Sequence, residues 1–227
     1  MRRYGTVLCA AALVFVACAG CNSSKFEHFG NNSLKAHANV TDKDLAYLEN
    51  RDEVWELDLR GTKVTNEGLA HLKGMDNLYA LDLQKTNVTG EGLAHLKEIK
   101  NLSSLYLGKG VKDEHLAYLE GVQKLSLLDL RHTQVSGEGL RHLQEVENLH
   151  ILDLRNMDIT GQYLGHLEDL ENLQKISLTR TEIGDEGLAQ VGKLTSLEKL
   201  NLGDTQVTDA GLIHLKGLHN LEWLELW

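Results

Sequence analysis

The chain has 227 residues, which is enough for one or two domains. Hydrophobic residues make up 42% and charged residues 25%, as in a soluble fold, but there is no proline and aromatic content is only 5%. The formal net charge of -10 argues against binding to nucleic acid and against electrostatic adsorption to anionic lipid, since both need a basic surface. All three cysteines lie in the first 21 residues, so the remainder can form no disulfide and no cysteine-based metal site.

Residues 1–20 have the order of an export signal. Arg2 and Arg3 form a short positive region, the stretch from Thr6 to Ala19 is almost wholly apolar or small, and a polar run begins at Asn22. The apolar stretch is shorter than the roughly 20 residues that a transmembrane helix needs. The sequence therefore predicts a signal peptide and an exported protein.

The segment Cys18-Ala19-Gly20-Cys21 resembles the lipobox of bacterial lipoproteins, in which the cysteine after two small residues is acylated. This resemblance implies lipidation at Cys21 and anchoring to a membrane of the bacterial cell envelope, on the periplasmic or the surface face. Two or more acyl chains would give a stable anchor. The alternative is ordinary cleavage near Gly20, with Cys21 incidental.

Two regions follow the signal. Residues 21–39 are rich in Asn, Ser, Lys and His and have no convincing period, which predicts a flexible tether. From Val40 onward the chain repeats itself, with two apolar residues separated by one other residue recurring every 24 residues and once after 23. These pairs are Leu57/Leu59, Leu81/Leu83, Leu105/Leu107, Leu128/Leu130, Leu152/Leu154, Ile176/Leu178, Leu200/Leu202 and Leu224/Leu226.

One unit reads L-x-x-L-x-L-x-x-T-x-V-T-x-x-G-L-x-x-L-x-x-L, and residues 40–227 resemble the leucine-rich repeat family. The Val-Thr-x-x-Gly-Leu variant is similar to bacterial Gly-Leu-rich members and to F-box-associated ones. The resemblance implies a right-handed α/β solenoid of about eight 24-residue coils. It places a parallel sheet on the concave side and short helices on the convex side, and stacking of the coils forms the core.

Polar columns accompany the leucines. Thr62, Thr86, Thr133, Thr181 and Thr205 recur after the strands, where we expect their hydroxyls to bond the backbone of adjacent coils. Thr or Ser precedes most helices as a candidate N-cap, except at Lys112 and Gly184, which are each followed by Asp. Histidines recur on the helices, but Tyr and Gln take the same position in other coils, so we predict no metal site. The histidines of this column are His71, His95, His142, His166 and His214.

The concave face carries the candidate binding residues, because curved repeat proteins typically bind there. The first coils are acidic, the later ones carry Lys175, Arg180 and Lys199, and apolar residues occupy the middle. A small apolar centre with a charged rim is typical of a protein-binding patch. The alternative for the charges is that Asp and Arg pair with one another along the sheet. The candidate residues are Tyr106, Leu127, Asp129, Arg131, Ile151, Asp153 and Arg155.

No catalytic motif is present in the sequence: we find no phosphate-binding loop, no zinc spacing and no nucleophile elbow. We therefore predict a scaffold without enzymatic activity or cofactor that binds a protein or peptide, and not nucleic acid, at the cell envelope. The alternative is a structural protein that self-assembles into a homo-oligomer through its C-terminal coil, where Leu224 and Leu226 lie at the edge of the sheet.

Overall fold

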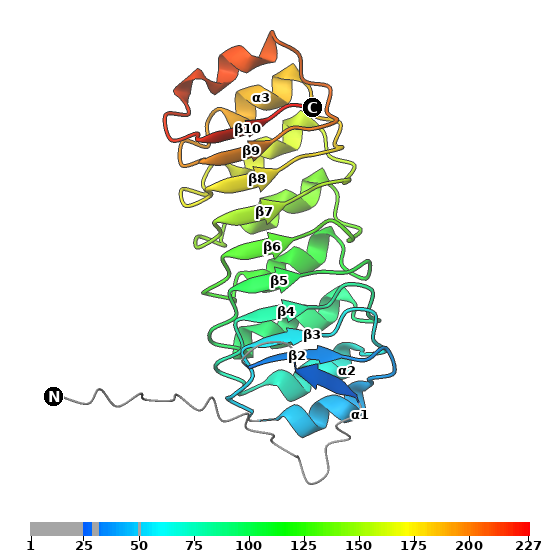
Figure 1. Ribbon diagram of the computed structural model, residues 1–227. Coiled ribbons are helices and arrows are strands. Elements are labelled where there is room, and N and C mark those ends of the chain that lie inside the picture. Colours follow the sequence, from blue (N-terminus) through cyan, green and yellow to red (C-terminus); the bar gives the residue numbers. More distant parts are fainter. Residues whose placement is uncertain (1–24, 29–31, 50) are drawn as a thin grey trace, which may run out of the picture.

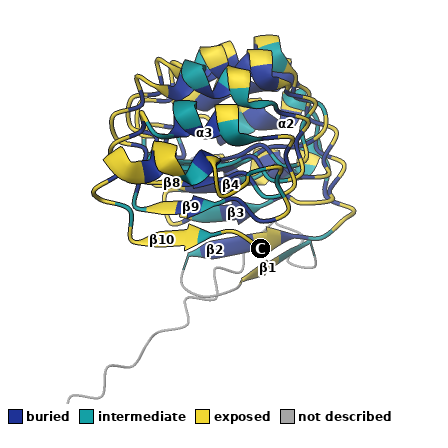
Figure 2. Ribbon diagram, turned by 90° about the horizontal axis from the view of Figure 1, so that it is seen from above, coloured by how far each residue is buried: buried dark blue, intermediate teal, exposed yellow. Residues whose placement is uncertain are grey.

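The computed structural model describes residues 25–28, 32–49 and 51–227. These residues form a stack of coils in which a single sheet makes one side and helices make the opposite side (Figures 1 and 2). The strands follow one another in the sheet in chain order, and every neighbouring pair is parallel except β1 and β2. The strands are β1 (Phe26–His28), β2 (Ser33–Ala36), β3 (Glu56–Asp58), β4 (Ala80–Asp82), β5 (Ser104–Tyr106), β6 (Leu127–Asp129), β7 (Ile151–Asp153), β8 (Lys175–Ser177), β9 (Lys199–Asn201) and β10 (Trp223–Glu225).

The register of the sheet confirms the predicted strand repeat. Leu57 pairs with Leu81, Leu81 with Leu105, and the same repeat position stays aligned as far as Leu224. The coil with 23 residues keeps this alignment, since Leu105 pairs with Leu128. Its shortened loop lies close to the preceding coil, where Gly90 N–H donates to the Gly110 carbonyl at 3.1 Å. A Cβ at Gly110 would lie 2.3 Å from the Val88 carbonyl oxygen, so only glycine fits this approach.

The helices are short and mostly of the 3-10 type. Their apolar residues recur every three positions, as at Leu93, Leu96 and Ile99, which matches the three residues per turn of a 3-10 helix. The sequence predicted the helical side of the stack but not this helix type. The α-helices are α1 (Asp42–Leu45), α2 (Asn66–Leu69) and α3 (Asp185–Val191), and the 3-10 helices are η1 (Ala46–Leu48), η2 (Ala70–Leu72), η3 (Gly90–Glu98), η4 (Asp113–Leu119), η5 (Gly137–Leu143), η6 (Gly161–Leu167) and η7 (Gly211–Gly217).

One hydrophobic cluster runs through the whole stack. It extends from Leu34 to Leu218 and consists mainly of leucine and valine. The middle residue of each strand from β3 to β9 points into it: Leu57, Leu128 and Leu200, for example, are 0% exposed. Burial of this surface against the neighbouring coils is the main stabilising contribution, because a single coil cannot bury its own apolar face.

The described part of residues 21–39 differs from the predicted tether. Strand β2 pairs in parallel with β3, so that Leu34 aligns with Leu57, and β1 pairs with β2 as an antiparallel hairpin. Leu34 and Ala36 are buried while Lys35 between them is exposed. This alternation is the period of a half-buried strand, but three residues of it are too few to stand out from the sequence. The folded unit therefore begins before Val40.

Polar links join successive coils at the helix starts. Asp42 accepts hydrogen bonds from the backbone N–H and the hydroxyl of Thr65, both at 2.7 Å. Asp113 accepts the equivalent pair from Ser136, and Asp185 accepts it from Thr208. The aspartates after Lys112 and Gly184, where the predicted cap is missing, thus bond the cap residue of the next coil.

Candidate protein-binding surface

The open face of the sheet is built from two residues of each strand. In strands β3 to β9 the middle side chain is buried, and the first and third side chains point to the other side of the sheet. Parallel pairing aligns these residues into two columns. The first column is Glu56, Ala80, Ser104, Leu127, Ile151, Lys175, Lys199 and Trp223, and the third column is Asp58, Asp82, Tyr106, Asp129, Asp153, Ser177, Asn201 and Glu225.

Four of the predicted site residues, Asp129, Arg131, Asp153 and Arg155, form an Asp–Arg network. Arg131 donates from Nη2 to Asp129 at 2.6 Å, and its Nε lies 3.3 Å from an Asp153 oxygen. Arg155 donates from Nη2 to Asp153 at 2.6 Å. These charges therefore pair with one another along the sheet, as the alternative interpretation of the sequence predicted.

The Asp–Arg network is partly buried and holds neighbouring strands of the open face together. Asp129 is 1% exposed and also accepts a hydrogen bond from Gln84 Nε2 at 3.1 Å. The bonds to Asp129 and Asp153 raise the pKa values of Arg131 and Arg155 above the usual range, because they stabilise the charged guanidinium groups. With its charges matched, the centre of the open face carries little net charge for a partner to meet.

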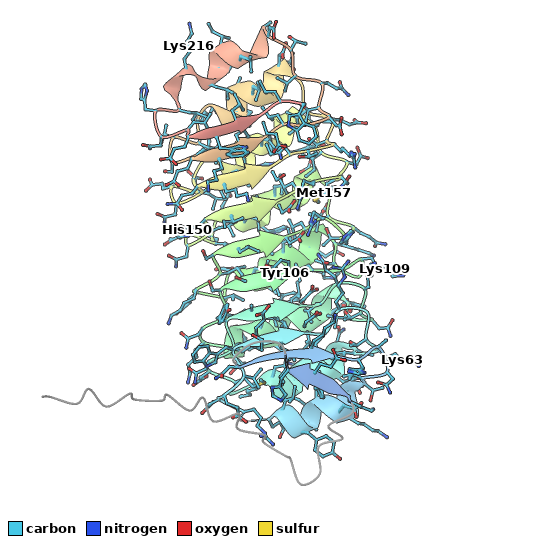
Figure 3. All side chains as sticks on the ribbon, in the orientation of Figure 1. Lys63, Tyr106, Lys109, His150, Met157 and Lys216 are labelled. Carbon is cyan, nitrogen blue, oxygen red and sulfur yellow. The ribbon has the colours of Figure 1, made fainter. Side chains whose placement is uncertain are left out.

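The other three predicted residues form a partly exposed apolar centre. Leu127 and Ile151 are register neighbours in β6 and β7 and are half-buried. Tyr106, also half-buried, lies on the adjacent strand β5 in the third column, in register with Asp129, on the open face of the stack (Figure 3). Burial, and then the nearby Asp129 and Asp82 charges, raise the pKa of Tyr106, so its hydroxyl is neutral at ordinary pH. All seven predicted residues thus lie on one surface, with the charged ones bonded to each other and the apolar ones available for contact.

A shallow hollow next to Tyr106 was not among the predicted site residues. It is lined by β3 and β4, with acidic side chains at Glu56, Asp58 and Asp82. Burial raises the pKa of Asp82 to about 6, and the neighbouring Asp58 charge adds to the effect. The sequence signal was the small residue Ala80 at a first-column position, which leaves this space open.

Other predicted features can be placed as well. Cys21 and residues 1–20 lie outside the described residues. His71 of the histidine column lies 2.5 Å from Glu49, an exposed contact between neighbouring coils. Residues 25–28, 32–49 and 51–227 contain no group of His, Cys, Asp and Glu side chains suited to a metal ion. In the same residues, none of the helices has the length and apolar character that a membrane span needs.

Comparison with known proteins supports the fold. The leucine-rich repeat family model matches residues 169–191 and 193–216, and a comparison with curated proteins gives no significant match. Internalin C2 from Listeria monocytogenes is 23% identical with a TM-score of 0.67, over 86% of this chain and 80% of that one. The plant peptide hormone receptor RGFR1, solved in complex with RGF2, is 17% identical with a TM-score of 0.52, over 91% of this chain and 37% of the receptor. The chain thus has the fold of a leucine-rich repeat solenoid.

Proposed function

We propose that this leucine-rich repeat solenoid is a non-enzymatic scaffold that binds a protein or peptide on the open face of its sheet. Extended repeat surfaces of this kind generally serve to bind other proteins. The observation that carries the proposal is the apolar centre of Tyr106, Leu127 and Ile151. Half-buried apolar side chains flanked by satisfied charges resemble the core and rim of a protein interface.

The rigidity of this surface supports the same function. The Asp–Arg network fixes side chains that would otherwise lose conformational freedom on binding, since Arg131 bonds Asp129 and lies within ion-pair distance of Asp153. A preorganised surface loses less entropy when a partner docks. We therefore assign Asp129, Arg131, Asp153 and Arg155 to support of the surface, and direct contact to the apolar centre.

We test this function by crosslinking and pull-down from an envelope extract of the producing organism. The bait is the full chain, compared with a variant carrying Tyr106→Ala, Leu127→Ser and Ile151→Ser. A matched control carries Tyr118→Ala and Ile213→Ser, which change exposed residues of the helical side. A partner captured by the wild type and the control, but lost by the first variant, is expected. Equal capture by all three baits would refute the proposal.

We further propose that the scaffold is exported and held at the envelope membrane by acylation of Cys21, as the lipobox resemblance implies. Metabolic labelling with an alkyne fatty acid tests this directly. The wild-type chain should take up label and sediment with membranes, and Cys21→Ala should do neither. A Cys9→Ala variant is the matched control and should behave like the wild type.

Self-association through β10 is a second candidate. Trp223 in β10 is 60% exposed and Trp227 after it is 83% exposed, so two large apolar side chains lie at this edge of the sheet. Sedimentation at increasing protein concentration tests this candidate. Self-association that survives the open-face substitutions and is lost with Trp227→Ala would favour it over the binding function.

A further inference from the structure

Two like-charged pairs lie at opposite ends of the open face. Asp58 and Asp82 are register neighbours in β3 and β4, and Lys175 and Lys199 are register neighbours in β8 and β9. Like charges directly opposite each other on neighbouring strands are destabilising. Each pair therefore disfavours the isolated fold, and the two pairs differ in sign.

A third like-charged pair lies between these two in the sheet, and it is the only one of the three whose charges are neutralised by bonded arginines. Asp129 and Asp153 are also register neighbours, and Arg131 and Arg155 bond them. Two coils earlier, Gln84 occupies the repeat position of Arg131. Its backbone N–H donates a hydrogen bond to Asp82 at 2.8 Å, but its side chain supplies no positive charge.

The remaining outer charges are equally open. Asp58 accepts a backbone hydrogen bond from Arg60, whose side chain forms no ion pair with any residue that the structure describes. Within the described ranges, Lys175 and Lys199 are exposed and without an ion pair. Both outer pairs are thus free to meet charges of a partner.

The first column has the same polarity. It runs in register from Glu56 through the small residues Ala80 and Ser104 to the apolar Leu127 and Ile151, and then to Lys175 and Lys199, which precede Trp223 of the last strand. An acidic end, an apolar centre and a basic end therefore follow one another along a single line of side chains. Burial and the Asp58 charge raise the pKa of Asp82 although the Arg60 charge opposes the rise, which agrees with a carboxylate that no cation among the described residues bonds directly.

We infer that the open face binds an extended peptide segment that is basic at one end, apolar in the middle and acidic at the other. The basic end lies over Asp58 and Asp82, the apolar residues contact Leu127 and Ile151, and the acidic end lies over Lys175 and Lys199. This inference rests on the proposed function and specifies the chemistry of the partner.

The geometry sets the spacing of the segment. From β4 to β8 there are four strand intervals, which at the usual separation is about 19 Å. An extended chain advances about 3.3 Å per residue, so the basic and acidic residues should stand about six positions apart. A helix would need about twice as many residues to cover the same distance.

The test uses three synthetic peptides of equal length, about ten residues each, with the same leucine-containing centre. The first has a lysine pair at one end and a glutamate pair at the other, the second has lysine pairs at both ends, and the third has glutamate pairs at both ends. The purified full chain should bind the first about tenfold more tightly than either other peptide at low salt. Since the whole chain carries a net charge of -10, nonspecific attraction would instead favour the second peptide.

A charge reversal gives a change of preference that misfolding cannot produce. With Lys175→Glu and Lys199→Glu, both ends of the open face become acidic, and the peptide with lysine at both ends should become the tightest binder. The matched control is Lys97→Glu with Lys216→Glu, which makes the same change of net charge at exposed positions on η3 and η7 and should keep the wild-type order.

The inference is overturned if the wild type does not prefer the mixed peptide, or if the reversed variant keeps the wild-type order. If the capture that depends on Tyr106, Leu127 and Ile151 still holds in either case, the open face binds a partner of another charge arrangement and only this inference fails. If the peptide preference and the capture that depends on Tyr106, Leu127 and Ile151 are both absent, the proposed function fails together with this inference.

Discussion

At the scale of single residues, Asp82 is the group whose ionisation most affects the open face. Burial raises its pKa from 3.8 to about 6, with Asp58 and Asp129 adding to the effect, while Arg60 and the Gln84 N–H oppose it. The folded state therefore binds this proton more tightly than the unfolded state does. The stability that follows is fully present below pH 3.8 and is lost as the pH rises through about 6.

Asp82→Asn should remove this pH dependence. The amide keeps an oxygen to accept from Gln84 N–H but cannot ionise, so the variant should be more stable than the wild type by about 1 kcal/mol at pH 8, after allowance for solvent screening. The two proteins should be nearly equal at pH 4. Urea denaturation across this pH range measures the difference in free energy of unfolding between the two proteins. The other carboxylates contribute equally to both proteins and cancel in this difference. A constant difference at every pH would contradict the assignment.

The threonine column illustrates what a repeat pattern predicts about a residue and what it leaves out. Its positions were predicted, and the structure buries three of its members, Thr62, Thr86 and Thr181. The partner was not: Thr62 Oγ1 donates to the Leu59 carbonyl of its own coil at 2.7 Å, and not to an adjacent coil. The repeat period identifies which residues share an environment. The hydrogen-bond acceptor of each threonine hydroxyl depends instead on the conformation of the turn.

At the scale of elements, the aspartates at the helix starts connect one coil to the next. Asp113→Ala should destabilise the fold by about 1 kcal/mol, because it removes both bonds to Ser136, which are exposed to solvent and are worth less than buried ones. Thermal unfolding followed by circular dichroism measures the loss.

The chain itself supplies the control for this prediction. Asn66 occupies the same repeat position and bonds Thr89 in the same way, accepting from its N–H at 2.8 Å and donating to its hydroxyl at 2.7 Å. Asp113→Asn should therefore retain most of the wild-type stability. If the alanine and asparagine variants lose equal stability, the link between coils does not depend on these hydrogen bonds.

Other features of the elements needed the structure. The spacing by three at Leu140, Leu143 and Val146 fits one face of either helix type, and the packing of short coils decides for 3-10. The β1–β2 hairpin went unpredicted because it covers the first coil without repeating its sequence. On the open face, the sequence identified which residues gather there, but pairing within the Asp–Arg network depends on distances that no spacing reveals.

At the scale of the whole molecule, the continuous core has a consequence for unfolding. The hydrophobic cluster runs unbroken from Leu34 to Leu218, and it continues across the coil with 23 residues. In a solenoid the coupling between neighbouring coils determines whether the ends unfold together. Since each coil from β3 to β9 buries its strand leucines against the neighbouring coils, we expect a single cooperative transition.

The three tryptophans report on the two ends separately, because Trp55 precedes β3 and Trp223 and Trp227 lie in the last coil. A Trp55→Phe variant reports on the C-terminal end, and a Trp223→Phe, Trp227→Phe double variant reports on the N-terminal end. Both should give the same urea midpoint by fluorescence. Leu128→Ala in the central coil, where the side chain is 0% exposed, should lower both midpoints together and cost about 3 kcal/mol. Two separate midpoints, or a shift at one end alone, would mean that the coils on either side of β6 unfold independently.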